Sequence, residues 1–220
     1  MAHSTAEPVA IAIFAKAPTE CIAKTRLIPR LGAAGAAELQ RRLIERTIHM
    51  AREAQIGPVS LWCSPSKNDP YFASLGERIA ITRHNQRDGD LGVRMQHCIV
   101  VETKTMPTLL VGTDCAVITA GHLARCADAL RSGVDSAFIP VEDGGYILVG
   151  MRRPIPELFA AIPWGTSDVM AETRKRIAGL NITTFELPPL WDIDRPNDYD
   201  RAIAEGALVP INVASRTKRL

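Results

Sequence analysis

Thr108-Leu-Leu-Val-Gly-Thr-Asp114 is an apolar run that ends in a glycine, a hydroxyl and a carboxylate. Its first part, Thr108–Val111, lacks the alternation of polar and apolar residues that marks a strand with one wet face. Val9–Phe14 has the same character. Strands that are buried on both faces are typical of a parallel sheet covered by helices, so both runs predict an α/β fold.

Strand-like and helical patterns alternate along the rest of the chain. The predicted strands are Val9–Phe14, Val59–Cys63, Arg78–Thr82, Thr108–Val111, Asp135–Pro140, Tyr146–Met151 and Ile182–Leu187. The predicted helices are Ala33–Gln55, Leu91–Glu102, Ala120–Arg131, Ser167–Gly179 with Thr166 or Ser167 as its N-cap, and a short one from Asn197. This alternation indicates βαβ units and a mostly parallel sheet. We predict one domain, residues 1–206, followed by a tail, residues 207–220.

Composition excludes several classes of protein. The chain has 220 residues with a net charge of +2, and 46% of them are hydrophobic. The balanced charge gives no support for nucleic-acid binding. No stretch approaches the about 18 apolar residues that span a bilayer, and the five cysteines form no CxxC pair. We therefore expect a cytoplasmic protein without a membrane span or a nucleic-acid partner, and leave open whether it forms homo-oligomers.

Charged residues follow several of the predicted strands. In open α/β sheets, ligands bind beyond the carboxyl ends of the strands, so these residues should meet at one edge of the sheet. Cations follow the first strand and carboxylates follow three later ones: Lys16, Lys24 and Arg26, then Asp114, Glu142, Asp143, Asp192 and Asp194. This division suits a phosphate ligand that is bridged by a metal ion.

The three cations lie in one short loop that contains neither of the common phosphate-binding motifs. The sequence has no GxxxxGK[ST] and no GxGxxG. Lysine offers a point charge and arginine a two-pronged donor, and both suit phosphate oxygens. Solvated surface cations would give the same pattern, but the position after a buried first strand favours phosphate binding.

Asp114 is the strongest candidate for a metal ligand, because the apolar strand before it delivers its carboxylate to the ligand edge. Mg²⁺ or Mn²⁺ typically takes one or two protein carboxylates and completes its shell with phosphate oxygens and water. A second carboxylate could come from Asp192 or Asp194. The alternative is that Asp114 only caps the turn that follows it.

Two glycine-containing loops each allow two interpretations. Asp143-Gly144-Gly145-Tyr146 suits a plain hairpin turn. Its glycines would also let the backbone approach a substrate, with Asp143 and Glu142 facing sugar hydroxyls. The loop from Gln86 to Gly92 is either the entry to a helix or a contact to a nucleotide base, and by itself it favours the helix entry.

Seven short motifs, in this order, resemble the bacterial DUF2064 family over almost the whole chain. They are Phe14-Ala-Lys-Ala-Pro18, Lys24-Thr-Arg-Leu27, Asp90-Leu-Gly-x-Arg-Met95, Gly112-x-Asp-Cys115, Asp143-Gly-Gly-Tyr146, Trp164-Gly-Thr166 and Asp192-Ile-Asp194. Each motif is weak alone, and their order carries the resemblance. Members of the family are described as glycosyltransferase-like proteins of the nucleotide-diphospho-sugar transferase superfamily.

The resemblance implies a GT-A type fold, a Rossmann-like three-layer α/β/α sandwich that binds a nucleotide together with Mg²⁺ or Mn²⁺. It implies that Asp114 and Asp194 hold the metal ion. Asp143 is then the candidate catalytic base, beside Asp114 as the second catalytic carboxylate. The implied nucleotide or phosphate contacts are Lys16, Lys24, Arg26, Gln86 and Asp90. The implied contacts to sugar or acceptor are Gly144, Gly145, Tyr146, Trp164 and Thr166.

The chain departs from the family pattern in two places. It has Glu20-Cys21 and Ala116-Val117 where the family usually has Pro-Gly. Without glycine, the first loop loses the freedom that a close backbone approach to phosphates requires. Glu20 also adds a negative charge beside the proposed phosphate site.

Three functions remain open. The leading hypothesis is a metal-dependent glycosyltransferase that uses a nucleotide-diphospho-sugar, in which the metal and the basic loop stabilise the departing nucleoside diphosphate. The second is a guanylyl- or cytidylyl-type nucleotidyltransferase that releases pyrophosphate, since Ala23-Lys-Thr-Arg-Leu27 resembles the AK[ST]RL loop of phospholactate guanylyltransferases. The third is a non-catalytic nucleotide-sugar-binding protein, which the altered first loop suggests.

Overall fold

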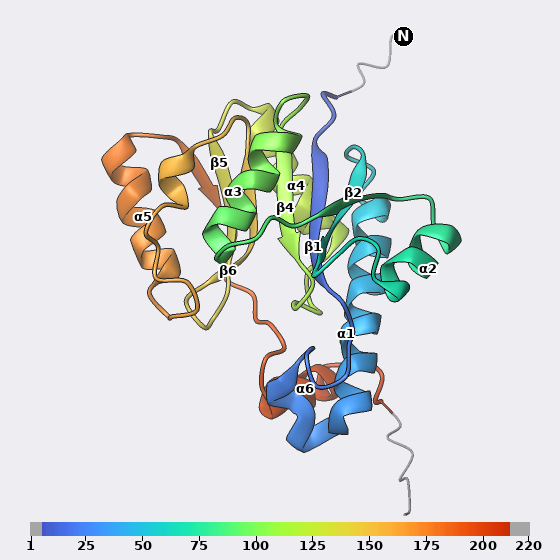
Figure 1. Cartoon of the computed structure of the whole chain (residues 1–220). Coiled ribbons are helices and arrows are strands. Elements are labelled where there is room, and N and C mark those ends of the chain that lie inside the picture. Colours follow the sequence, from blue (N-terminus) through green and yellow to red (C-terminus); the bar gives the residue numbers. More distant parts are fainter. Residues whose placement is uncertain (1–5, 212–220) are drawn as a thin grey trace, which may run out of the picture.

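The computed structural model describes residues 6–211, with a seven-stranded sheet at the centre (Figure 1). The strand order is β3-β2-β1-β4-β6-β5-β7. Neighbouring strands are parallel except β6, which runs antiparallel to β4 and β5. The strands are β1 Ala10–Lys16, β2 Val59–Ser64, β3 Thr82–Asn85, β4 Thr108–Gly112, β5 Ser136–Pro140, β6 Tyr146–Met151 and β7 Thr184–Glu186. The predicted mostly parallel α/β sheet is confirmed.

Helices cover both faces of this sheet (Figure 1). Within residues 6–211 the α-helices are α1 Ile28–Glu53, α2 Pro70–Arg78, α3 Leu91–Glu102, α4 Ala120–Arg131, α5 Val169–Leu180 and α6 Pro196–Ala204. Apolar side chains of α1, α2 and α4 pack in one core cluster, and those of α3 and α5 pack in another. Helix α6 packs against the first half of α1 in a third cluster. The fold is therefore a three-layer α/β/α sandwich, as the resemblance implies.

Strand β1 explains why the sheet needs cover on both sides. Ile11 and Ile13 pack in the cluster that contains α1 and α4, whereas Ala12 between them packs in the cluster that contains α3. In the neighbouring strand β4, Val111 and Leu110 divide between the two clusters in the same way. All five side chains are buried, so an apolar run without polar alternation is what these central strands require.

The predicted strand Arg78–Thr82 is wrong, because this part of the chain contains the end of a helix that the sequence analysis missed. Helix α2 begins after Asp69, whose carboxylate accepts a hydrogen bond of 2.9 Å from the Tyr71 amide. Phe72 is buried on its inner face. The strand itself, β3, follows at Thr82–Asn85 and forms an edge of the sheet, where polar residues are tolerated.

Two predicted helix starts also need correction. Helix α1 begins at Ile28 rather than Ala33, but Gly32 is non-helical (φ 68°, ψ 168°), so the predicted start is the residue after a kink. The N-cap of α5 is Asp168, neither Thr166 nor Ser167. The Thr166 hydroxyl instead donates a hydrogen bond of 2.8 Å to the Pro163 carbonyl.

The predicted tail begins inside the packed part of the chain. Leu208 and Ile211 pack against the cluster of α1 and α6, and the Ile211 amide donates a hydrogen bond of 2.9 Å to the Tyr199 hydroxyl. The rest of the predicted tail, residues 212–220, lies outside the described residues. Across residues 6–211, no helix combines the length and the hydropathy that a bilayer crossing would need.

Candidate functional site

A pocket of about 960 Å³ lies beyond the carboxyl ends of β1 and β4, where the sequence predicts the ligand edge. It is lined by most of the predicted site residues: Lys16, Lys24, Arg26, Gln86, Asp114, Asp143, Gly145, Tyr146, Trp164, Thr166 and Asp194. Two predicted residues, Asp90 and Gly144, do not line it. Loops that are far apart in the sequence therefore meet at one edge of the sheet.

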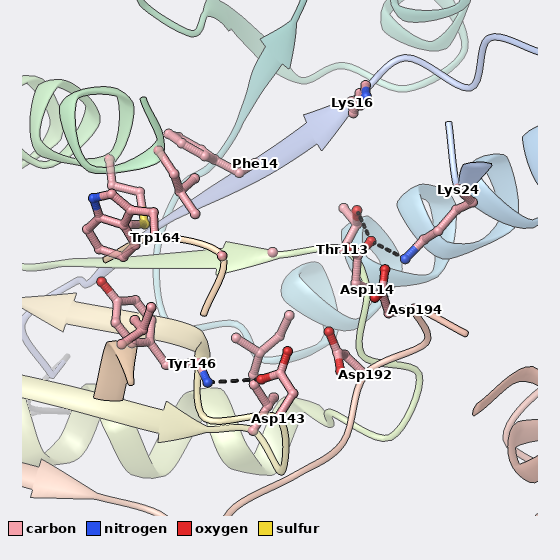
Figure 2. Close-up of a pocket in the computed structure, with 18 of the residues that line it drawn as sticks. Phe14, Lys16, Lys24, Thr113, Asp114, Asp143, Tyr146, Trp164, Asp192 and Asp194 are labelled. Atoms are coloured by element: carbon pink, nitrogen blue, oxygen red, sulfur yellow. Dashed lines mark hydrogen bonds and ion pairs between the residues drawn. The ribbon is translucent and has the colours of Figure 1, made fainter. Parts of the chain in front are cut away.

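Lys24 connects three of these loops (Figure 2). Its ammonium lies 2.8 Å from Asp114 Oδ1 and donates a hydrogen bond of 2.5 Å to the Ile193 carbonyl. The Lys24 side chain is only 5% exposed, whereas that of Asp114 is 46% exposed. The lysine is thus buried behind the aspartate, whose carboxylate remains open to the pocket.

A second ion pair, between Arg26 and Asp194, lies nearer to solvent, with side chains that are 66% and 41% exposed. Two of the three predicted phosphate-binding cations, Lys24 and Arg26, thus pair directly with the predicted metal-binding carboxylates, although they come from separate loops. An incoming ligand has to compete with these pairs.

Asp192 brings a further carboxylate into the pocket. Burial, together with the negative charges of Asp143 and Asp114, raises its pKa to about 6, against the opposing effect of Lys24. Three carboxylates from three loops therefore share one electrostatic environment. Within residues 6–211, however, no three or more His, Cys, Asp or Glu side chains are arranged as a ready metal site.

The turn at Asp143 joins the antiparallel strands β5 and β6 as a hairpin turn, and Asp143 and Gly145 also line the pocket. Asp143 Oδ1 accepts a hydrogen bond of 2.9 Å from the Gly145 amide (Figure 2). Gly144 has φ +93°, and a Cβ there would overlap the Ser167 carbonyl. The Gly144 carbonyl accepts a hydrogen bond of 2.8 Å from the Met170 amide, which ties the turn to the start of α5. Gly144 thus holds the turn in place against α5 without lining the pocket itself.

Two aromatic rings form the wall opposite the carboxylates (Figure 2). Tyr146 and Trp164 meet edge to face, with ring centroids 6.2 Å apart. Burial raises the pKa of the Tyr146 hydroxyl, which therefore stays protonated. Trp164 packs tightly against α3, because a Cβ at Gly92 would overlap its Nε1. These rings offer an apolar, rigid surface to a ligand.

The remaining predicted contacts are occupied within the protein. Lys16 is exposed and donates a hydrogen bond of 3.1 Å to the Ile22 carbonyl. Asp90 caps α3 by accepting a hydrogen bond of 2.9 Å from the Val93 amide, as the helix-entry interpretation of that loop predicts. Gln86 is buried and donates from Nε2 to the Trp62 carbonyl at 2.7 Å.

Arg94 and Gln40 are polar residues that line the pocket but are not among the site residues predicted from the sequence. Arg94 lies near the start of α3, and its side chain donates to Gln86 Oε1. Gln40 is buried on α1 and reaches the Lys16 carbonyl and Thr113 Oγ1, both at 3.3 Å, so it joins the ends of β1 and β4. The motif Asp90-Leu-Gly-x-Arg-Met95 contained a signal for Arg94, and nothing in the sequence pointed to Gln40.

A family model described as "Uncharacterized protein conserved in bacteria (DUF2064)" matches residues 47–166, more than half of the chain. The chain belongs to the DUF2064 family. This DUF2064 protein is also similar to a crystal structure from Desulfovibrio desulfuricans G20 that is provisionally named a nucleotide-diphospho-sugar transferase. The TM-score is 0.78 and the identity 25%, over 85% of this chain and 82% of that one.

More distant solved structures show the same fold. A cytidylyltransferase from Leptospira borgpetersenii has a TM-score of 0.61 and 12% identity, over 93% of this chain and 89% of that one. CMP:2-keto-3-deoxy-manno-octonic acid synthetase, in complex with CTP, has a TM-score of 0.59 and 12% identity, over 91% and 98%. A comparison with curated proteins finds no match. These distant solved structures thus share the fold of the DUF2064 protein.

Proposed function

We propose that this protein transfers a glycosyl group from a nucleotide-diphospho-sugar to an acceptor, with a divalent cation held by Asp114 and Asp194. One observation carries the proposal: a single pocket beyond the carboxyl ends of the strands contains Lys24, Arg26 and these two carboxylates. This combination of charges suits a diphosphate that binds together with a cation. The likeness to a nucleotide-diphospho-sugar transferase supports it.

The donor atoms of the pocket fit Mg²⁺ or Mn²⁺. Asp114 and Asp194 offer carboxylate oxygens, the hard ligands that these ions prefer, and both side chains are partly open to solvent. Burial raises the pKa of Asp192, and the negative charges of Asp143 and Asp114 add to this effect; a cation would relieve the repulsion between these carboxylates. When bound, the ion would stabilise the charge of the leaving diphosphate as a Lewis acid.

The protein's own residues would bind the two ends of the reacting bond. Lys24 and Arg26 would contact phosphate oxygens, so that their charges stabilise the departing nucleoside diphosphate. Asp143 is the candidate base, because the Gly145 amide orients its carboxylate inside the pocket. It would accept the proton of an acceptor hydroxyl while that oxygen attacks the anomeric carbon. Tyr146 and Trp164 would form the apolar wall beside the sugar.

A nucleotidyltransferase is the second candidate, and the likeness to a cytidylyltransferase and to a synthetase in complex with CTP supports it. In that reaction an acceptor oxygen attacks the α-phosphorus of a nucleoside triphosphate, and pyrophosphate leaves. Lys24 and Arg26 would then bind the pyrophosphate. A non-catalytic nucleotide-sugar-binding protein is the third candidate, and the combination of Asp114, Asp143 and Asp194 in one pocket argues against it.

Product analysis separates the two reactions. The protein is incubated with Mn²⁺ and with a panel of nucleotide sugars and nucleoside triphosphates. Glycosyl transfer releases a nucleoside diphosphate from a nucleotide sugar. Release of pyrophosphate from a triphosphate would instead exclude the glycosyltransferase proposal. A thermal-shift panel with the same compounds adds a binding test, because a ligand that binds the native state raises its melting temperature. No response from any nucleotide would exclude both reactions.

Asp114→Asn tests the metal site. We expect nucleotide affinity in Mn²⁺ to fall at least about tenfold, since even outer-shell changes cost that much in metal affinity. The difference in affinity between Mn²⁺ and EDTA should also disappear. Asp88→Asn is the matched control, because Asp88 is exposed and does not line the pocket. Unchanged affinity and metal dependence in Asp114→Asn would show that the metal assignment is wrong.

A further inference from the structure

The pocket contains a second cationic group that lies away from the paired lysine and arginine. Arg94 comes from α3 and is anchored on the β2 side of β1, through Gln86. Lys24 is anchored on the β4 side of β1, through Asp114. Both cations line the same pocket. The ligand therefore meets positive charge on two sides of β1.

Gln86 fixes the position of the Arg94 side chain. Its Nε2 donates to the Trp62 carbonyl at 2.7 Å and to the Ala15 carbonyl at 3.4 Å. Because these two carbonyls can only accept, the amide orientation is determined, and Oε1 faces the Arg94 guanidinium. Gln86 is buried, so this anchor is held by the ends of β1 and β2.

Across residues 6–211, Arg94 has no carboxylate within 4.0 Å, and Gln86 is the acceptor that the structure gives its side chain. A guanidinium has five N–H donors, so most of them remain available. Lys24 and Arg26, in contrast, are neutralised by Asp114 and Asp194. Lys16 and Arg195 also line the pocket without an ion pair among these residues, but they are exposed, so water solvates their charges.

Arg94 is half-buried, and this makes its charge costly without a ligand. Burial lowers the pKa of its guanidinium, and no neighbouring acid opposes that effect. A buried charge without a partner destabilises a protein, so a site that keeps one is expected to use it. Two exposed apolar side chains, Ile22 and Leu91, line the same pocket and offer a surface to the organic part of a ligand.

We propose that Arg94 binds a phosphate oxygen of the substrate, with Gln86 as the residue that positions its guanidinium. The inference rests on the proposed function, because it assigns this contact to the nucleotide. Gln86 holds one edge of the planar group and leaves parallel N–H donors for a phosphate, which arginine binds in two-pronged fashion. Arg94 can thereby bind an anion directly, whereas Lys24 and Arg26 must first separate from Asp114 and Asp194.

The test is calorimetric binding of inorganic pyrophosphate in EDTA, so that only protein groups contribute. We expect Arg94→Met to weaken binding about tenfold or more, as the loss of charged hydrogen bonds predicts. Arg94→Lys should recover part of the affinity, because a lysine restores the positive charge but not the two parallel N–H donors of the guanidinium. Arg87→Met is the matched control: Arg87 is an exposed arginine outside the pocket, and its loss changes the net charge equally.

The melting temperatures of the same variants separate binding from a structural role. A merely structural arginine would lose stability on replacement, whereas Arg94→Met should keep or raise the melting temperature because it removes an uncompensated charge. Equal pyrophosphate affinities for Arg94→Met and Arg87→Met would overturn the proposal.

The failure of the proposed function would give a different result. If the wild-type chain binds pyrophosphate but no nucleotide or nucleotide sugar, the proposed function is wrong, and the loss of pyrophosphate binding in Arg94→Met still supports the Arg94 assignment. If the wild-type chain binds neither pyrophosphate nor any nucleotide, both proposals are overturned.

Discussion

The two cationic sides of the pocket differ in backbone and in charge pairing. Lys24 lies on a loop whose backbone is left-handed at Cys21 (φ 60°) and at Lys24 itself (φ 49°), and its ammonium is neutralised by Asp114. Arg94 lies on the regular helix α3 and lacks a carboxylate partner among residues 6–211. The Lys24 side thus has a strained backbone and a neutralised charge, whereas the Arg94 side has a regular backbone and a charge without a carboxylate partner.

This difference shows two ways in which a pocket can hold a cation that binds an anionic ligand: in an ion pair with a carboxylate, or without a carboxylate partner. A neutralised pair is stable without a ligand, but the ligand must separate the pair before it can use the cation. An unpaired, half-buried cation costs stability and is ready to bind. The carboxylate side also contains Asp192, whose raised pKa indicates that it too is electrostatically unfavourable without a ligand. Three predictions test whether the contribution of each region to the stability of the protein comes from local backbone strain or from charge.

The largest expected effect is on the turn that supports the carboxylate side. Gly144→Ala should destabilise the protein by about 3 kcal/mol, because the residue combines a positive φ with a Cβ that would overlap the Ser167 carbonyl. Gly165→Ala is the matched control: Gly165 also has a positive φ (+82°), but a Cβ there meets nothing within 4 Å. It should cost only about 1 kcal/mol. Urea unfolding measures both values, and equal losses would mean that the contact with Ser167 is unimportant.

The sheet could be predicted from sequence because its central strands are apolar on both faces. Val9–Phe14 and Thr108–Val111 carry that signal; the first lies in β1 from Ala10 onward, and the second lies in β4. Strand β3 could not be placed, because Thr82–Asn85 is a polar edge strand without a hydrophobic pattern. The apolar Ile79 and Ile81 beside it pack against the core from the connection and gave a false strand signal.

The site could be predicted loop by loop but not contact by contact. The rule that ligands bind beyond the carboxyl ends of strands brought Lys24, Arg26, Asp114 and Asp194 to one edge. Which cation meets which carboxylate depends on contacts between residues far apart in the sequence, which no local pattern encodes. The placement of Arg94 was hidden for a related reason, since its burial and its lack of a carboxylate partner among residues 6–211 depend on how α3 packs on the sheet.

The second prediction concerns charge on the carboxylate side. Asp192 has a pKa raised from 3.8 to about 6, so the folded state binds its proton more tightly than the unfolded state does. Its contribution therefore favours the folded state below about pH 4 and is lost as the pH rises towards 6. Asp192→Asn should raise stability at pH 7.5 in EDTA by about 1–2 kcal/mol, after allowance for partial solvent exposure.

Thermal unfolding between pH 3.5 and 8 measures this effect for Asp192→Asn against wild type. The gain in melting temperature should be absent at the acid end, grow between about pH 4 and 6, and stay constant above that. Asp88→Asn is the control, because Asp88 is exposed and outside the pocket. A gain of the same size at every pH would show that the Asp192 charge is not the cause.

The smallest expected effect is on the strained loop that carries Lys24. Cys21 has a φ of 60°, which lies in the left-handed region that favours glycine. Cys21→Gly should therefore stabilise the protein by about 0.5–1 kcal/mol, since relief of the strain exceeds the greater entropy of glycine in the unfolded chain. Cys21→Ser keeps the strain while it removes the thiol, so it should leave stability unchanged. Urea unfolding measures the stability of both variants. Equal stability would mean that the left-handed conformation of Cys21 costs no free energy. The backbone strain on the Lys24 side would then come from Lys24 alone.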